Sequence, residues 1–269
     1  MNIRDRFTLE VKDGVGFISL ARPDKRNVMD GDFFEGLVEV VGLVDKDPEI
    51  RVAVIKGDGK SFTAGLDLTW AGALLMEGGG PDAREKLRKG ILALQNSNNV
   101  IERSLKPFIA AVHSHCIGGG IDLLAACDIR LCTKDAVFSI RETKLAIIAD
   151  LGTLQRLPAI VGQGWYRELA LTGRDFFADE ALQMGFVTRV LPDKEALFPE
   201  AGKLAAEIAA LPPLTVQGVK DVANFTKDYG VPASLAYVAQ KNAANLPSED
   251  LMEAVTAFMQ KRTPVFKGK

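Results

Sequence analysis

The chain has 269 residues, of which 47% are hydrophobic, and its mean hydropathy is +0.08. A chain of this size and composition can bury a large core, either as one domain or as one domain with a smaller appended piece. Its 33 basic and 35 acidic residues leave a net charge of −2. This balance excludes a general nucleic-acid or membrane-surface binder, so an anionic ligand would have to be held by a local basic patch.

Strands and helices alternate in the first half of the chain. Apolar and polar residues alternate on both sides of Asp13-Gly14, a dipeptide that favours tight hairpins, and this predicts two strands within residues 7–20. Short apolar runs predict buried strands at 52–57 and 108–112. Helices are predicted at about 30–46, 83–104 and 120–127, the second of them after a glycine-rich turn at 77–81 that is the best candidate for a mobile surface loop.

The second half is predicted to be almost entirely helical. Glycine and proline breakers separate the helical segments, and Ser248, followed by Asp250 and Leu251, predicts an N-cap for the last of them. The predicted segments lie near 153–159, 162–171, 178–184, 195–210, 213–228, 234–244 and 248–261.

A first candidate site follows the predicted strand 52–57, in the stretch GDGKSFTAGLDL at 57–68. It is not a phosphate-binding P-loop, because Lys60 comes too early and no second glycine precedes a Lys-Ser/Thr pair. It offers a strand end, a flexible glycine and a backbone N–H at Leu66 that could point outward. For Asp67 the local interpretation as a cap or turn residue is favoured.

A second candidate site is the stretch IGGGIDLLAAC at 117–127, which follows the predicted strand 108–112. Glycines at a helix start leave backbone N–H groups bare and direct the positive end of the helix dipole at whatever lies in front. Two such turns could each donate one N–H to the same oxygen and form an oxyanion hole, which stabilises an enolate or a tetrahedral intermediate. Packing alone explains either glycine turn equally well.

Three carboxylates, Asp122, Glu142 and Asp150, lie in apolar sequence neighbourhoods. Buried acids close to one another raise each other's pKa and can carry protons at neutral pH. Each acid also has a local interpretation. Asp122 could be a first-turn or N-cap acid, Glu142 could pair with Arg141 or Lys144, and Asp150 could cap the helix that begins near 152.

Basic and metal-ligating residues are sparse near these stretches. Lys25 and Arg26, together with Arg22, are the best candidates for an anion-binding cluster, with a solvated face as the equal alternative. The two histidines, His113 and His115, lie beside Cys116, but a fourth metal ligand is missing, and no metal is predicted.

Four motifs occur in order along the chain: ARPDKRNVM, GDGKSFTAGLDL, HSHCIGGGIDLLAACDIRLC, and GTLQRLPAIVG followed by LTGRDFFADEALQMGFVTRVLP. Over nearly its whole length the chain resembles the crotonase, or enoyl-CoA hydratase/isomerase, superfamily. The resemblance implies an α/β fold, with a spiral of ββα units over 1–200 that contains the active site and a C-terminal helical region over 201–269 that forms trimers. It also implies an acyl-CoA thioester substrate, a homotrimer or dimer of trimers, and no separate cofactor, because coenzyme A is part of the substrate.

The resemblance extends to single positions. Leu66 and Gly119 fall where the superfamily has its two oxyanion-hole amides, which would bind the thioester carbonyl. Neighbouring positions are implied to contact the substrate or its CoA: Lys25, Arg26, Ala64, Gly65, Asp67, Leu68, Gly118 and Gly120.

The acids distinguish the subfamilies. Hydratases of the superfamily carry Glu at the positions of Asp122 and Glu142 and a small residue at position 150. This chain has the shorter Asp122 and the additional Asp150, a pattern that closely resembles the Δ3,5-Δ2,4-dienoyl-CoA isomerases of unsaturated fatty-acid β-oxidation. In that resemblance Glu142 takes the C2 proton, Asp150 protonates C6, and Asp122 orients the pair.

Two other functions are weighed against isomerisation. One is an ordinary 2-enoyl-CoA hydratase, and the other is a non-catalytic crotonase-fold subunit for assembly or RNA binding. The three retained acids and the lack of basic excess disfavour the second. No targeting signal is recognised at either end of the chain, the longest apolar runs are shorter than a membrane span, and the three cysteines are predicted to be reduced, so a cytoplasmic enzyme is expected.

Overall fold

The computed structural model of the chain describes residues 1–75 and 80–269, and the predicted loop at 77–81 falls mostly outside the described residues. A mixed sheet forms the centre of the body, with its strands in the order β1-β2-β3-β4-β5-β7-β10. The first three are antiparallel, and β3 to β10 run parallel. These strands are β1 Asn2–Ile3, β2 Phe7–Lys12, β3 Val15–Leu20, β4 Val52–Gly57, β5 Phe108–Val112, β7 Ile129–Thr133 and β10 Arg189–Leu191.

A second, smaller sheet holds β6 His115–Ile117, β8 Val137–Ser139 and β9 Asp175–Phe177. Single residues also pair beside it, since Thr63 bridges Cys116 in parallel. Successive chain units therefore place one strand in the large sheet, an extended segment in the small sheet, and then a helix. This repetition is the predicted spiral of ββα units, and it brings the segments after β4 and after β5 next to each other.

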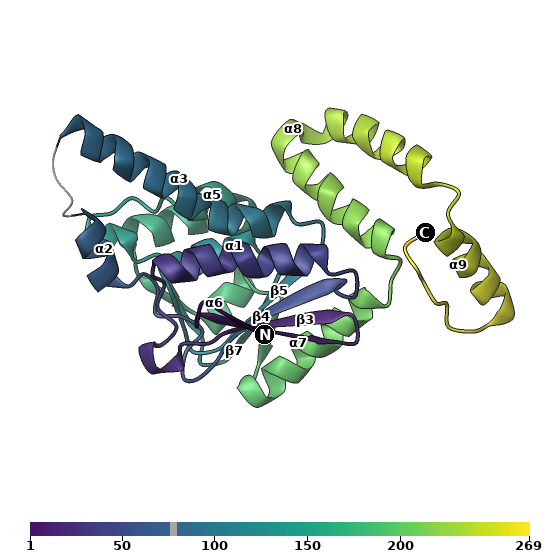
Figure 1. The fold of residues 1–269 in the computed structure, drawn as a ribbon, viewed down its shortest axis with the longest axis horizontal. Helices are drawn as coiled ribbons and strands as arrows, with labels where there is room; N and C mark the ends of the chain where they lie inside the picture. The colour runs from purple at the N-terminus through teal and green to yellow at the C-terminus, as the bar shows by residue number, and fades with distance from the viewer. Residues whose placement is uncertain (76–79) are drawn as a thin grey trace.

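Helices cover both faces of the large sheet (Figure 1). α7 lies over β3, β4, β5 and β7 and closes a core of small and branched side chains, while α1, α3 and α5 lie on the opposite side over a larger core that contains most of the phenylalanines. The helices are α1 Gly31–Lys46, α2 Leu68–Leu75, α3 Pro81–Arg103, α4 Gly119–Ala126, α5 Thr153–Thr172, α6 Ala178–Gln183, α7 Lys194–Ala209, α8 Pro213–Asn245 and α9 Glu249–Gln260, with short 3-10 turns at Pro23–Lys25 and Glu142–Leu145.

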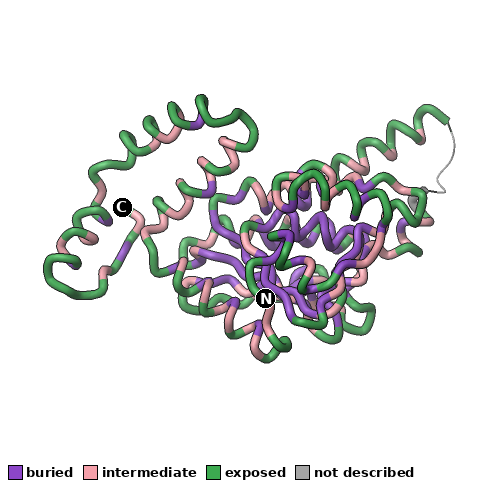
Figure 2. The backbone as a smooth tube through the Cα atoms, turned by 180° about the vertical axis from the view of Figure 1, so that it is seen from behind, coloured by how far each residue is buried: buried purple, intermediate pink, exposed green. Residues whose placement is uncertain are grey.

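The C-terminal helices α8 and α9 extend away from this body (Figure 1), and their outer surfaces are largely exposed (Figure 2). The domain boundary predicted after residue 200 falls inside α7, whose residues Leu197 to Ala209 pack on the sheet. The division into two regions stays a prediction. Within the described ranges, none of the helices combines the length and the hydropathy needed to cross a bilayer.

The predicted hairpin, both buried strands and the helix starts agree with the structure to within a few residues. Breaks between helices occur at glycines, because Gly162 and Gly230 adopt positive φ angles of 76° and 77° inside what are otherwise continuous helices. Ser248 accepts a hydrogen bond from the Leu251 N–H at 3.1 Å, which confirms the predicted N-cap. The second half also contains β9 and β10, which the almost entirely helical prediction missed.

Lys220 attaches α8 to the body. Its ammonium group is buried and donates to the Asp128 carboxylate at 2.8 Å and to the carbonyl oxygens of Ile101 and Lys106. Asp128 also accepts from the Phe108 N–H, so it ties the start of β5 to the C-terminal region.

Replacing Lys220 by Met should lower the free energy of unfolding by about 3 kcal/mol, because it leaves buried carbonyls and a carboxylate without their donor. Urea unfolding followed by circular dichroism measures this. Lys241→Met is the matched control, since Lys241 pairs with Asp221 nearer the surface of the same helix and should cost about 1 kcal/mol or less. Equal losses in the two variants would contradict the anchoring role.

Candidate active site

The turn after β4 pairs with Met29 through two backbone hydrogen bonds, and one backbone N–H of this turn has no acceptor. The Met29 N–H donates to the Gly65 carbonyl and the Asp67 N–H donates to the Met29 carbonyl, both at 2.9 Å. The Leu66 N–H between them donates to no described residue. Gly65 has φ +87°, and a Cβ there would come within 2.6 Å of the Ile117 carbonyl oxygen. The absence of a side chain therefore lets this turn touch the glycine turn after β6.

The second turn presents another free donor at the start of α4. Gly118 has φ +54° and donates its N–H to the Ser139 carbonyl at 2.8 Å. Gly119 is the first residue of α4, and its N–H is accepted by no described group, as expected at a helix start. A Cβ on Gly119 would lie 3.1 Å from the Met29 sulfur. The unpaired N–H groups of Leu66 and Gly119 thus belong to turns that both contact Met29.

The Glu142 carboxylate faces this second turn. Its Oε1 lies 3.3 Å from the position that a Cβ on Gly118 would occupy, and its Oε2 is buried without a hydrogen-bond partner. Burial raises the pKa of Glu142, and the nearby charge of Asp150 raises it further. The local alternative is not seen: Arg141 binds Ser139 and Asp175 instead, and Lys144 makes no ion pair with Glu142.

Asp122 is buried in the first turn of α4, with 1% of its surface exposed. Its Oδ1 accepts a hydrogen bond from the Thr153 N–H at 2.6 Å, so it serves the start of α5 and not of its own helix. Burial, reinforced by the charge of Glu142, raises the pKa of Asp122 to about 7. Asp122 therefore connects the glycine turn to the loop that carries Asp150.

The raised pKa of Asp122 makes stability depend on pH. The folded protein binds the Asp122 proton more tightly than the unfolded chain, so this contribution is complete below about pH 4 and is lost as the pH rises through about 7. Asp122→Asn keeps the acceptor for Thr153 but removes the titration. Above pH 7 the free energy of unfolding of this variant should exceed that of the original protein by about 4 kcal/mol.

Chemical denaturation at pH 4 to 8 measures this difference, which should be near zero at the acid end. Asp179→Asn, at an exposed position in α6, is the control and should show no such trend. A stability difference that is the same at every pH would show that Asp122 does not titrate as described.

Asp150 lies in the loop that leads into α5 and is partly exposed. Gln95 of α3 donates to its backbone carbonyl at 2.7 Å, and Asn98 donates to the carbonyl of Leu151 at 3.2 Å. Both of these bonds go to backbone oxygens, and the Asp150 carboxylate accepts no hydrogen bond from another described residue. The N-cap position of α5 is occupied by Gly152. The interpretation of Asp150 as a helix cap is therefore wrong. Burial raises the pKa of this acid.

The acids interact electrostatically across these elements. The charges of Glu142 and Asp150 both raise the pKa of Asp122, and that of Asp150 raises the pKa of Glu142. Glu142 and Asp122 lie near the turn that carries the unpaired Gly119 N–H, and Asp150 is coupled to both of them. Carboxyl groups with raised pKa values in such a setting can accept and release protons around a substrate whose carbonyl oxygen is held.

The basic residues lie beside the first turn. The Arg26 carbonyl accepts the Ala64 N–H at 2.9 Å, and the side chains of Lys25 and Arg26 are exposed. Arg22, in contrast, pairs with Asp30 at 2.6 Å. Of the predicted cluster, Lys25 and Arg26 are therefore available to an anion.

The other residues that were predicted to contact the substrate lie in different environments. Leu68 is exposed at the start of α2, whereas Asp67 accepts the N–H groups of Thr69 and Trp70, as its interpretation as a local cap predicted. A Cβ on Gly120 would meet the Thr63 methyl group at 2.6 Å, so this glycine serves close packing. The roles of these residues toward a ligand stay predictions.

Sequence reasoning did not single out Met29, Gln95 or Asn98. Each is an ordinary residue for its helix or loop, and its contact with the site appears only when segments far apart in the chain come together. No local signal could have identified these residues.

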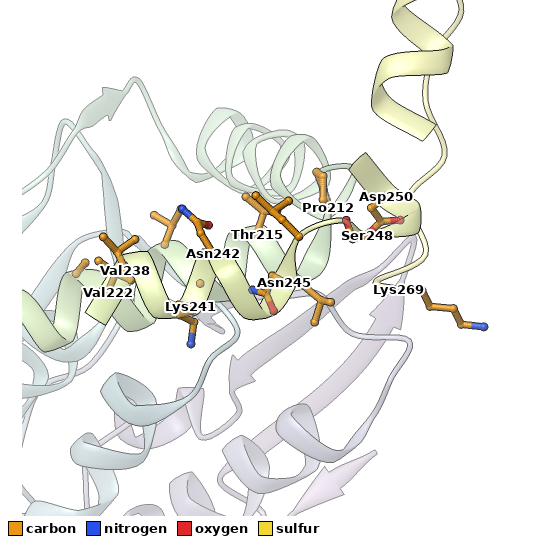
Figure 3. Close-up of a pocket in the computed structure, with 15 residues that line it drawn as sticks. Pro212, Thr215, Val222, Val238, Lys241, Asn242, Asn245, Ser248, Asp250 and Lys269 are labelled. Carbon is orange, nitrogen blue, oxygen red and sulfur yellow. The ribbon is translucent and has the colours of Figure 1, made fainter. Parts of the chain in front are cut away.

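A large apolar cavity lies elsewhere in the molecule, between the two halves of α8 and the C-terminal tail (Figure 3). It has a volume of about 500 Å³ and is lined by residues such as Val222, Val238 and Leu246. None of the predicted site residues lines it, so it is not part of the candidate active site. Over residues 1–75 and 80–269, no group of three or more His, Cys, Asp or Glu side chains could hold a metal ion.

The chain is similar to known proteins over most of its length. The profile of the enoyl-CoA hydratase/isomerase family matches residues 10–269. The chain is 45% identical to the mitochondrial Δ3,5-Δ2,4-dienoyl-CoA isomerase of Dictyostelium discoideum, over 94% of this chain and 87% of that one. It is 41% identical to the peroxisomal enzyme of that name from Arabidopsis thaliana, over 99% of both chains.

Among solved structures, the enoyl-CoA hydratase of Bacillus anthracis is similar with a TM-score of 0.90 and 30% identity, covering 98% of this chain and all of that one. The predicted crotonase fold is thereby confirmed. The expectation of a cytoplasmic enzyme is wrong, because the similar isomerases are named as mitochondrial and peroxisomal proteins. That expectation relied on the lack of a recognised targeting signal, and this lack does not decide the compartment of a protein.

Proposed function

The chain belongs to the enoyl-CoA hydratase/isomerase family, and we propose that it converts 3,5-dienoyl-CoA into 2,4-dienoyl-CoA in the oxidation of unsaturated fatty acids. The observation that carries this proposal is the presence of two separate carboxyl groups with raised pKa, Glu142 and Asp150, of which Glu142 lies beside the turn that carries the unpaired Gly119 N–H. Moving both double bonds requires proton loss at C2 and proton gain at C6. Because these carbons are several bonds apart, two separate carboxyl groups suit the reaction better than one.

The reaction begins at the carbonyl. The N–H groups of Leu66 and Gly119 hold the thioester oxygen, and the Glu142 carboxylate removes a proton from C2. The electron pair of the broken C–H bond moves into a dienolate, whose negative oxygen is stabilised by the two donors and the positive end of α4. Burial suits Glu142 to this step, because a raised pKa of the carboxylic acid makes its carboxylate a stronger base.

The reaction ends at the far end of the diene. The enolate oxygen re-forms the carbonyl, the double bonds shift to C2–C3 and C4–C5, and C6 takes the proton from Asp150. Asp122 does not transfer a proton itself. It holds the Thr153 N–H and thereby fixes the loop of Asp150 relative to the turn at Gly118 and Gly119.

The CoA moiety has a consistent place beside the first turn. The exposed cations of Lys25 and Arg26 suit its phosphates, and the turn from Ala64 to Leu68 leads from these cations to the Leu66 donor. Gly118 allows the thioester to approach the backbone closely.

The active form is a homotrimer or a dimer of trimers, in which other copies cover the C-terminal helices. Large apolar side chains such as Phe258 and Met259 of α9 are 85% and 77% exposed in the single chain, and the cavity of Figure 3 lies in the same region. Exposed apolar surface of this kind favours association.

Ultraviolet spectroscopy tests the proposed function. Purified protein mixed with 3,5-dienoyl-CoA should generate the absorbance of the conjugated 2,4-dienoyl thioester without any added cofactor. Failure to do so, together with rapid addition of water to 2-enoyl-CoA, would identify a hydratase instead. Two features of Asp122 disfavour a hydratase. Its carboxylate already accepts a hydrogen bond from the Thr153 N–H, and its side chain is one methylene shorter than that of Glu, so it reaches less far toward a substrate.

A further inference from the structure

The proposed reaction leaves the two acids in exchanged protonation states. Before each turnover Glu142 must be ionised and Asp150 protonated; after it, Glu142 carries the C2 proton and Asp150 is a carboxylate. The next turnover cannot begin until Glu142 has lost a proton and Asp150 has gained one. The protein therefore needs a route for this resetting step, which changes no bond in the substrate.

A cavity of about 510 Å³ opens beside Asp150, between α3, α5 and α8. Gln95 and Asn99 of α3 line it on one side, and Gln155 and Arg156 of α5 on another. It is distinct from the glycine turns, since neither Leu66 nor Gly119 lines it.

The lining is suited to water and not to a fatty acyl chain. Arg156 donates to Glu102 at 2.7 Å and to Asn99 at 2.6 Å, and Lys227 of α8 pairs with the same Glu102 carboxylate. Although burial opposes it, the two cations lower the pKa of Glu102, which stays ionised at neutral pH. An apolar chain would have to displace the water that solvates these charges, at a high cost in free energy. A polar space of this size holds water readily.

The two acids differ in their relation to the cavity. Both residues are partly exposed, but Asp150 lines the cavity, whereas Glu142 does not and its Oε2 atom is buried without a hydrogen-bond partner. Glu102 cannot supply the proton while it remains ionised, which leaves water that enters the cavity as a source for Asp150.

We propose that this cavity is a proton port, through which Asp150 regains its proton from solvent water after every turnover. The proton taken from C2 by Glu142 returns to solvent in a separate step, so that one proton leaves and one enters and the enzyme is restored. The alternative is direct transfer from Glu142 to Asp150 between turnovers, which would carry the C2 hydrogen of one substrate molecule to C6 of the next. The inference depends on the proposed isomerisation.

Isotope tracing distinguishes the two routes in the unmodified protein. Unlabelled 3,5-dienoyl-CoA is converted in D2O over many turnovers at low conversion, and the product is analysed by mass spectrometry and NMR. The port requires close to one deuterium per molecule at C6. Protium at C6, with little deuterium at C2 of the recovered substrate, would establish internal transfer and overturn the proposal.

A second test uses a substitution that makes the cavity narrower. Gln155 is exposed at the cavity wall, and Gln155→Trp should obstruct the water path. Because resetting follows product release, kcat should fall several-fold while kcat/KM stays within about twofold of the original value. Gln163→Trp is the matched control on the same helix, exposed but outside the cavity lining, and should change neither parameter.

An unchanged kcat in Gln155→Trp, or an equal loss in kcat and kcat/KM, would contradict the port. If that variant does not fold, as judged by circular dichroism, the isotope experiment on the unmodified protein still tests whether the C6 proton comes from solvent, and protium at C6 would still overturn the proposal. Failure of the proposed function is a different result, since no 2,4-dienoyl product would then form in either solvent.

Discussion

Asp150→Asn is expected to lower the formation of 2,4-dienoyl-CoA by about 10²–10⁴-fold while leaving hydrogen exchange at C2 of the substrate intact. Asparagine has the shape of Asp150 but no proton of suitable acidity for C6. Glu142 would still remove the C2 proton and form the dienolate. In D2O the protonated Glu142 would exchange its proton for a deuteron and then deliver that deuteron to C2. Product absorbance measures the loss, and deuterium incorporation at C2 in D2O measures the retained first step.

The loop around Asp150 should keep its structure in this variant, because Gln95 holds the backbone carbonyl and not the side chain. Asp179→Asn, at an exposed carboxylate in α6, is the matched control and should behave as the original protein. Turnover like that of the original protein in Asp150→Asn would remove this acid from the mechanism.

Glu142→Gln is expected to abolish both steps, with a loss of product formation of about 10³-fold or more and no exchange at C2. Glutamine cannot accept the proton, and no dienolate can form for Asp150 to protonate. Its amide would also place a donor near Gly118, where Glu142 Oε1 now lies. The same two assays apply, and the pattern of exchange separates this variant from Asp150→Asn.

Glu168→Gln is the control for this substitution, since Glu168 pairs with Arg174 at a largely exposed position of α5. Retained C2 exchange in Glu142→Gln would show that another group is the base. Asp122 would then be the next candidate, because it is buried in the first turn of the helix that Gly119 begins, and burial raises its pKa.

Local signals in the sequence were reliable where the conformation depends on neighbouring residues. Asp13-Gly14 forms the predicted hairpin turn, Gly162 and Gly230 interrupt helices at positive φ, and Ser248 caps α9. These features act within a few residues of the chain, so the pattern of side chains contains the necessary information. The strands β6, β8, β9 and β10 are only three residues long and were missed, because partners elsewhere in the chain stabilise them.

The candidate site divides in the same way. The sequence by itself determined which groups are present: two strand-to-helix glycine turns and three acids in apolar surroundings, at spacings that resemble the dienoyl-CoA isomerases. It could not determine what each acid contacts. Asp122 was weighed as an acid of its own helix and instead accepts a hydrogen bond from the start of α5, while Asp150 was weighed as a helix cap and instead lines a polar cavity.

Only the tertiary structure decided these contacts, because they join segments far apart in the chain. Gln95 meets the loop of Asp150 across 55 positions, and the two glycine turns touch only because Gly65 lacks a side chain where the Ile117 carbonyl lies. Charge interactions and burial depend on distance in space, which residue order does not specify. The acids were therefore visible in the sequence, whereas their raised pKa values and the access of Asp150 to solvent are products of the fold.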